Sequence, residues 1–285
     1  MQAAWGGGIF WENPPSIAAR VNEMSGGSLT IQVLSVDAVV KTSQMQDAVH
    51  RSVLDAAHSE PAYWYGKCKA ASIFGTGPCF RWSCLDVLGW AHAGGGQELF
   101  DKLMDTLRLN VVPFFNSPMP AQPMGWFKEE IKDASQMEGL TYRTVGLAAD
   151  GLLDMGMSVV QLPRGEIQSA MKSGLIDAAE FNNPTLDRDF CMQDVSKHYH
   201  LASFHQSQEF FEATINKDRF NALSDAHKAI IKNASMAKNS GFYWGNTKRY
   251  SDDLEKLQKA DAKDVMNYLI LNQPDYKLAY NHYFA

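Results

Sequence analysis

The sequence contains no long apolar run, few cysteines and no block of like charges. No segment reaches the roughly 18 to 20 apolar residues with which a helix spans a bilayer, and no stretch reads as a signal peptide. Four cysteines in 285 residues are too few for a disulfide scaffold, although Cys79 and Cys84 lie close enough in sequence to pair. A net charge of −6 without a run of one sign argues against nucleic acid as a partner.

The composition is that of a globular protein with one large or two ordinary domains. Hydrophobic residues make up 45% and charged residues 20% of the 285 positions, and both are ordinary values. Several of the seven tryptophans stand in polar surroundings, namely Trp5, Trp11, Trp64 and Trp126. Aromatic side chains beside polar groups suit a small-molecule site, and core packing explains them equally well.

The most regular pattern covers residues 139–181. Three segments with strand character, 141–145, 159–162 and 176–181, alternate with two stretches of helical spacing that each end at a glycine. Such alternation predicts parallel strands joined by crossover helices, and hence an α/β fold. Parallel sheets bind their ligands beyond the carboxyl ends of the strands.

Two charged residues fall on these expected strands, Arg143 on the first and Glu180 on the last. Strands of this kind are normally buried, and an unpaired charge there costs free energy. The two side chains therefore either satisfy each other, with Glu166 as a second acid available to Arg143, or they face a ligand crevice.

The remaining chain is expected to alternate in a similar way. Before the central pattern we expect helices from Pro14 and over 44–57 and 99–107, strands at 29–34 and 111–115, an aromatic loop at 63–67 and an irregular stretch at 71–88. After it we expect a loop at 182–193, strands at 198–203 and 209–215, and helices at 223–240 and 250–259.

A cluster of prolines marks the expected crossing between two domains, and it consists of Pro113, Pro118, Pro120 and Pro123. The strand at 209–215 is expected to return the chain to the first domain. We therefore expect lobe I to comprise residues 1–119 and 209–285, with the C-terminal helices, and lobe II to comprise residues 120–208.

Five short motifs occur in a characteristic order along the chain: Ser25-Gly-Gly-Ser-Leu-Thr-Ile31, Gln46-Asp-Ala-Val49, Gly139-Leu-Thr-Tyr-Arg143, Leu162-Pro-Arg-Gly-Glu166 and Gly174-Leu-Ile-Asp-Ala-Ala-Glu180. With them the chain resembles, from about residue 5 to about residue 260, the DctP-type solute-binding proteins of TRAP (tripartite ATP-independent periplasmic) transporters. The segments 63–67, 94–96 and 125–127 look closest to the branch that binds 2-oxo acids and related monocarboxylates.

The resemblance implies a type II-like periplasmic binding protein, in which two α/β lobes enclose a ligand cleft. It implies a periplasmic location and a small organic carboxylate, such as a 2-oxo or 2-hydroxy acid, as the ligand. It also implies the membrane permease subunits of a TRAP transporter as partners. In some relatives the last helices make a dimer contact, so a homodimer stays open.

The resemblance also assigns ligand-binding residues. An arginine at the position of Arg143 forms a bidentate bridge to the ligand carboxylate. A guanidinium suits this role because it matches the two carboxylate oxygens in one plane and keeps its charge when desolvated. Trp64 and Tyr65 would close the pocket from the first lobe, and Asn183 either contacts the ligand or caps the segment that follows it.

In the 2-oxo acid branch a cation lies beside the ligand carboxylate. Its ligands map to the side chains of Gln122, Glu180 and Gln206 and to the backbone carbonyl of Phe181. Oxygen donors of this kind suit Na⁺ or Ca²⁺ rather than zinc. The relatives usually have tryptophan at Phe181, glutamate at Gln206 and glycine at Arg164, and the charge missing at Gln206 weakens the case for a metal. Alternatively, the two glutamines only satisfy backbone groups.

Two other patterns carry little weight. His198, His200 and His205 lie near Cys191, but their spacing matches no common zinc site. The glycines 94–96 precede a helix but lack the lysine of a phosphate-binding loop, so they read as a turn.

We therefore predict a binding protein that delivers a small carboxylate to a membrane permease, and not an enzyme. The alternative is a carboxylate-processing hydrolase or lyase that uses Glu180 and a histidine. No nucleophile elbow, matched acid/base pair or cofactor fingerprint supports that alternative. A signalling receptor with the same binding fold would be marked by a fused transmembrane or kinase segment, and the sequence shows none.

Overall fold

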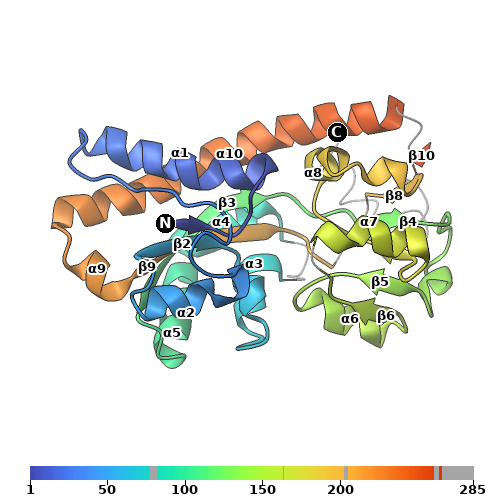
Figure 1. The fold of residues 1–285 in the computed structure, drawn as a ribbon, viewed down its shortest axis with the longest axis horizontal. Helices are drawn as coiled ribbons and strands as arrows, with labels where there is room; N and C mark the ends of the chain where they lie inside the picture. Colours follow the sequence, from blue (N-terminus) through green and yellow to red (C-terminus); the bar gives the residue numbers. More distant parts are fainter. Residues whose placement is uncertain (78–81, 163, 202–204, 260–262, 265–285) are drawn as a thin grey trace. The chain divides into compact units, whose positions relative to one another are not determined.

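The structure is a computed structural model that describes residues 1–77, 82–162, 164–201, 205–259 and 263–264. The chain divides into two compact units. Unit 1 comprises Met1–Pro120 and Gln208–Asn246, and unit 2 comprises Ala121–Ser207 and the described residues from Thr247 onward. Each unit has a sheet of its own (Figure 1). The described residues after Asn246, which we assigned to lobe I, thus belong to unit 2.

The sheet of unit 1 has the strand order β1-β2-β9-β3. Its strands are β1 Gln2–Ala3, β2 Ala56–Ser59, β9 Glu209–Asn216 and β3 Val111–Met119. β1 and β2 are parallel, and β9 is antiparallel to both β2 and β3. The two long strands β3 and β9 each carry a pair of phenylalanines and β-branched residues, which pack well on a pleated surface.

The helices of unit 1 are α1 Gly8–Met24, η1 Thr42–Gln44, α2 Met45–His50, η2 Pro61–Trp64, α3 Ala71–Thr76, α4 Cys84–Ala93, α5 Gly96–Thr106 and α9 Lys217–Asn221. Five of them, α2, η2, α3, α4 and α5, bury residues in one core. In this core the rings of Phe74, Phe100 and Phe115 cluster together, with Phe100 4.8 Å from Phe74 and 4.9 Å from Phe115 between ring centroids. α1 packs in a second cluster with α10, Asp225–Lys259, a long helix that begins in unit 1 and ends in unit 2.

The sheet of unit 2 has the strand order β10-β8-β4-β7-β5-β6. Its strands are β10 Lys263–Asp264, β8 His198–His200, β4 Gly125–Phe127, β7 Ala178–Ala179, β5 Thr141–Arg143 and β6 Ser158–Val160. β5 is parallel to β6 and β7, whereas β4 is antiparallel to β7 and β8. The helices of this unit are η3 Ala134–Met137, α6 Ala148–Asp154, α7 Arg164–Ser173, α8 Pro184–Asp189 and η4 Met192–Asp194.

The predicted alternation across 139–181 is confirmed, because β5, α6, β6, α7 and β7 follow one another in this order. Ile167 and Met171, on one side of α7, are buried in the same cluster as Trp126 of β4. Gly125 has a φ of +96°, and a Cβ there would lie 2.3 Å from the carbonyl oxygen of Ala179. Only glycine therefore allows β4 to approach β7 so closely.

Two expectations near the N-terminus were wrong. The first helix begins at Gly8 rather than at Pro14, so two prolines lie inside it. An interior proline removes a backbone donor and its ring crowds the carbonyl four residues earlier, so Pro14 and Pro15 weaken the hydrogen-bond ladder of α1 without ending the helix. The segment 29–34 is not a strand, because only Leu34 forms an isolated bridge, with Gln2. Its alternating pattern lacks the ladder of a partner strand.

Two further helices have different bounds from those expected. The helix expected over 44–57 ends at His50, and the chain turns through Ser52, which has a φ of +61°, into β2. The helical segments expected at 223–240 and 250–259 are joined in the single helix α10, which begins at Asp225. The residues between the two segments contain no proline, so nothing in their backbone chemistry interrupts the helix.

Short helices occupy three segments that we expected to be loops or irregular. η2 covers the first two residues of the aromatic loop 63–67, of which 65–67 form a turn. The stretch 71–88 contains α3 and the start of α4, and the loop 182–193 contains α8 and η4. α4 begins with a capping box, in which Ser83 and Asp86 satisfy each other's backbone N–H groups. Helices this short contain too few turns to repeat an apolar spacing, so the sequence pattern did not show them.

The possible pairing of Cys79 with Cys84 is not tested by the structure, because Cys79 lies outside the described residues. Cys84 is a buried free thiol that donates a hydrogen bond to the carbonyl of Met119 (3.2 Å). Within the described part of the chain, no helix combines the length and apolar character needed to cross a membrane.

Candidate functional site

Four predicted site positions of unit 2 lie at one edge of its sheet. β5 and β7 are parallel, β4 runs antiparallel to β7, and β8 runs antiparallel to β4. The ends of β5, β7 and β8 and the start of β4 therefore share this edge. Arg143 ends β5, Glu180 follows β7, Gln122 precedes β4 and Gln206 follows β8. A hydrogen bond from the backbone N–H of Gln122 to the carbonyl of Gln206 (3.0 Å) joins the last two.

Arg143 and Glu180 form a buried ion pair at this edge, with exposed fractions of 7% and 1%. Nη1 of Arg143 donates to the carboxylate oxygen Oε1 of Glu180 (3.0 Å) and to the backbone carbonyl of the same residue (2.9 Å). Nε donates to the carbonyl of Leu162 (3.1 Å). Nη2 forms no hydrogen bond with any described residue, so this nitrogen retains its donors for a ligand.

The carboxyl of Glu180 titrates near neutral pH. Burial raises the pKa of Glu180 to about 7, although Arg143 lowers it, while Asp187 raises it further. The 3.0 Å contact with the guanidinium favours the ionised form, and desolvation outweighs that effect. A further positive charge beside this carboxyl would shift it to the ionised form.

The structure adds Asp187, a residue that we had not singled out. Its carboxylate is fully buried and accepts hydrogen bonds from Nε1 of Trp126 (3.0 Å) and from the backbone N–H of Asn182 (3.1 Å). Burial raises the pKa of Asp187 to about 6, and these hydrogen bonds lower it. Trp126 stacks in turn on Tyr199, with centroids 4.3 Å apart. Asp187 therefore fixes the segment that follows Glu180.

Asn183 caps a helix in the structure. Its Oδ1 accepts a hydrogen bond from the backbone N–H of Leu186 (3.0 Å) at the start of α8, and its Nδ2 donates to the side chain of Asn182. Pro184 follows it at the first helical position, a pattern typical of helix starts that the sequence already contained. Asn183 therefore caps α8, which was one of its two predicted roles, and a ligand contact of Asn183 stays a prediction.

The donor set proposed for a cation fits a hard ion. Gln206 is fully buried, and neither Oε1 nor Nε2 of its amide has a hydrogen-bond partner among the described residues. Such an unpaired buried group costs about 1 to 3 kcal/mol, which an ion bound to Oε1 would offset in part. With Gln122, Glu180 and the carbonyl of Phe181, the set offers one carboxylate and neutral oxygens, which suit Na⁺ or Ca²⁺. The described residues contain no cluster of three or more His, Cys, Asp or Glu side chains.

Trp64 and Tyr65, the predicted residues of unit 1, differ in their surroundings. Trp64 is 2% exposed and belongs to the core, where its Nε1 donates to Glu212. Burial raises the pKa of Glu212 to about 7, and the bond from Trp64 lowers it. Tyr65 is half-buried, with Nζ of Lys69 5.2 Å from its ring centroid. Ligand contacts of both aromatic residues stay predictions.

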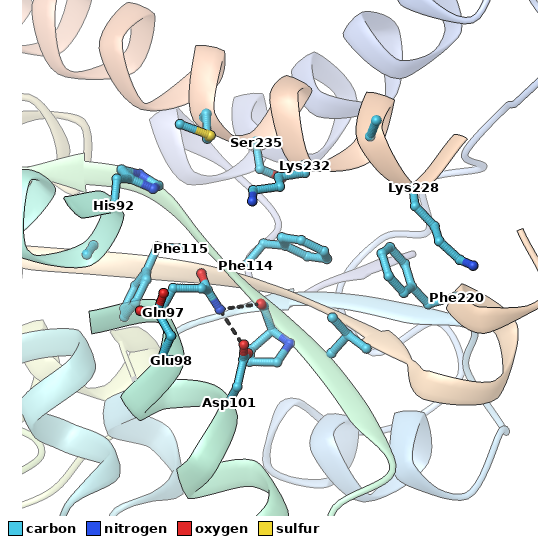
Figure 2. A pocket seen from close by; sticks show the side chains of 15 residues that line it. His92, Gln97, Glu98, Asp101, Phe114, Phe115, Phe220, Lys228, Lys232 and Ser235 are labelled. Carbon is cyan, nitrogen blue, oxygen red and sulfur yellow. Dashed lines mark hydrogen bonds between the residues drawn. The ribbon is translucent and has the colours of Figure 1, made fainter. Parts of the chain in front are cut away.

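Unit 1 also contains a pocket of about 510 Å³, lined by α5, β3 and α10 among other elements (Figure 2). Lys228 and Lys232 of α10 and Glu98 and Asp101 of α5 give its walls opposite charges. Gln97 donates to Asp101 (3.0 Å) and to the carbonyl of Pro113 (2.9 Å). None of the residues predicted to bind the ligand or cation lines this pocket, so it is separate from the candidate site.

Comparison with known proteins identifies the family. The model of the DctP family, described as bacterial extracellular solute-binding protein, family 7, matches residues 15–273. A monocarboxylate 2-oxoacid-binding periplasmic protein of Nostoc sp. is 30% identical over 224 residues, which are 79% of this chain. The chain spans 61% of the length of that relative.

Two solved structures have the same fold. One is a TRAP periplasmic solute-binding protein of Colwellia psychrerythraea with bound calcium and pyruvate, with 27% identity and a TM-score of 0.86. The other, from Pseudoalteromonas atlantica, has bound sodium and pyruvate, with 26% identity and a TM-score of 0.85. Each match covers 92% of this chain and 80% of the other chain. The predicted two-lobed α/β fold class is confirmed, and the chain belongs to the DctP family of bacterial extracellular solute-binding proteins.

Proposed function

We propose that this chain is the extracytoplasmic solute-binding subunit of a TRAP transporter, which captures a small organic carboxylate and delivers it to the membrane permease. The observation that carries the proposal is the buried pair of Arg143 and Glu180 at the strand-end edge of unit 2. A buried arginine with unused donors on Nη2 attracts an anion, because its charge persists when water is excluded.

The ligand class is a 2-oxo or 2-hydroxy acid. Nη2 of Arg143 would donate to the ligand carboxylate, while Nε and Nη1 hold the side chain in place through Leu162 and Glu180. The names of the relatives support this class: the protein of Nostoc sp. is described as binding 2-oxoacids, and two solved relatives contain pyruvate.

A cation belongs to the same proposal. Na⁺ or Ca²⁺ would be held by Gln122, Glu180, Gln206 and the carbonyl of Phe181, and it would supply positive charge to the ligand carboxylate. The sodium and calcium in the two solved relatives support such a site. Further ligand contacts of Trp64, Tyr65 and Asn183 are proposed on the family resemblance alone.

The proposed setting is the periplasm, with the TRAP permease subunits as partners. The family description, an extracellular solute-binding protein, favours a receptor over the hydrolase or lyase alternative. A homodimer is also proposed, and sedimentation equilibrium of the purified protein over a range of concentrations would detect it.

Isothermal titration calorimetry with pyruvate and lactate tests the function, with and without Ca²⁺ or Na⁺. We expect binding by the wild type and a loss of about 100-fold in Arg143→Lys, because an ammonium cannot hold Leu162 and Glu180 and also donate to the ligand. Arg51→Lys, an exposed position of unit 1, is the matched control and should bind as the wild type does. Equal affinities of Arg143→Lys and the wild type would refute the assignment of Arg143.

A further inference from the structure

A second guanidinium lies at the same edge of unit 2. Arg164 is the first residue of α7 and stands two residues beyond Leu162, whose carbonyl accepts the hydrogen bond from Nε of Arg143 (3.1 Å). Two residues of backbone span at most about 7 Å. The segment that carries Arg164 is therefore held directly by Arg143.

Two aromatic rings support the guanidinium of Arg164. Its central carbon lies 4.9 Å from the ring centroid of Phe181 and 4.8 Å from that of Phe190, and the two rings are 5.3 Å apart. A guanidinium on aromatic rings is held in place while its N–H donors stay available. Phe181 directly follows Glu180, which binds Arg143 through its carbonyl and its carboxylate.

The charge of Arg164 has no direct counterpart in the described part of the chain, where its guanidinium forms neither an ion pair nor a hydrogen bond. Asp187 and Asp189 are the acids that act on it electrostatically. Both are already engaged, Asp187 with Nε1 of Trp126 (3.0 Å) and Asp189 with Nη2 of Arg188 (2.9 Å). A half-buried cation with spare donors beside a carboxylate site suits a second anionic group.

We infer that Arg164 forms a second anion-binding subsite, which holds the distal carboxylate of a short 2-oxo dicarboxylate while Arg143 holds the carboxylate beside the oxo group. This inference rests on the proposed function and narrows its ligand class. Arg143 is paired with Glu180, whereas Arg164 has no direct partner among the described residues, so a dianion gains a charge-assisted contact at Arg164 that a monoanion does not. Phe181 and Phe190 position the second guanidinium, so little side-chain freedom is lost when the ligand binds.

The test compares 2-oxoglutarate with 2-oxopentanoate, which has the same carbon chain without the distal carboxylate. Calorimetry on the full chain should show that the wild type prefers the dianion by about tenfold or more, the effect of one charge-assisted contact. In Arg164→Met, which keeps an unbranched side chain over the two rings, the ratio should fall to about one. Affinity for 2-oxopentanoate should change by no more than about threefold, because Arg143 is intact.

Lys172→Met is the matched control, because it removes a positive charge from an exposed position near the other end of α7. It should leave the dianion preference unchanged. Arg164→Gln provides a second test if Arg164→Met does not reach the wild-type circular dichroism spectrum.

The outcomes separate the two levels of the proposal. A wild type that binds 2-oxopentanoate without preferring 2-oxoglutarate, or a preference that survives loss of Arg164, overturns the second subsite and leaves the proposed function standing. A wild type that binds no carboxylate at all overturns the proposed function as well.

Discussion

Cation binding in unit 2 is expected to release a proton, because Glu180 must ionise before it can hold an ion. Burial raises the pKa of Glu180 to about 7, whereas the pKa of an exposed glutamate is about 4.3. A metal and a proton compete for one carboxylate, so the affinity for the ion depends on pH. Arg143, which already binds this carboxylate, keeps its charge throughout the same range.

The expected magnitudes follow from a pKa of about 7. Such a group is about 90% protonated at pH 6, half protonated at pH 7 and about 10% protonated at pH 8. One bound Ca²⁺ should therefore release about 0.9, 0.5 and 0.1 protons at these pH values. The apparent affinity for Ca²⁺ should rise about fivefold from pH 6 to pH 7. From pH 7 to pH 8 it should rise less than twofold, because the carboxyl is then almost fully ionised.

Calorimetric titration with Ca²⁺ at saturating pyruvate, repeated in two buffers of different ionisation enthalpy, measures the released protons. Glu180→Gln should weaken cation binding and remove its dependence on pH. Glu212→Gln is the matched control, since burial also raises the pKa of Glu212 to about 7 but this residue lies in unit 1. A glutamine oxygen can still accept the N–H of Trp64 there.

Two results would refute this reasoning. One is an equal Ca²⁺ affinity of the wild type at pH 6 and pH 8 without proton release. The other is loss of the proton release in Glu212→Gln while Glu180→Gln retains it.

Three further predictions concern stability. Gly125→Ala should lower the free energy of unfolding by about 3 kcal/mol or more, because the φ of +96° and the carbonyl of Ala179 leave no room for a Cβ. Urea unfolding measures this change. Gly151→Ala is the control: this position in α6 has open space around it, so the substitution should be neutral or slightly stabilising. Asn183→Ala should lower the free energy of unfolding by about 1 kcal/mol through the lost cap of α8, and an unchanged thermal midpoint would contradict that role. Without bound cation, Glu180, Asp187 and Glu212 should each lower stability as the pH rises from about 4.5 towards 7, because the native state keeps a proton there that the unfolded state has lost. His58, His200 and His205 act in the opposite direction over much of this range, because burial lowers their pKa values to about 3 or 4. Glu212→Gln removes one carboxyl contribution, so its stability relative to the wild type should rise between pH 5 and pH 8 by at most about 3 kcal/mol; thermal scans of both proteins check this, and parallel pH profiles would contradict it.

Local patterns in the sequence were sufficient to predict the helices and strands at the centre of unit 2. The apolar spacing of α7, and glycines such as Gly174, with a φ of +82°, specify helices and strands within a few residues of themselves. Arg143 and Glu180 stood out because charges on strands that alternate with crossover helices are unusual in any fold. The sequence could not decide between an ion pair and a ligand crevice. The structure shows the ion pair, and Nη2 of Arg143 forms no hydrogen bond with the described residues.

Contacts between distant segments could not be predicted from the sequence alone. Asp187 and Trp126 are 61 positions apart, and only the fold shows that one carboxylate holds this indole and the segment behind Glu180. In the same way, residues 29–34 have the alternation of a strand but acquire no ladder, because a strand needs a partner that its own residues do not supply. The sequence by itself determined the central helices and strands and the choice of Arg143, since these depend on neighbours a few residues away. The tertiary structure decided which buried groups meet and which donors remain unused, since burial and pairing depend on segments that only folding brings together.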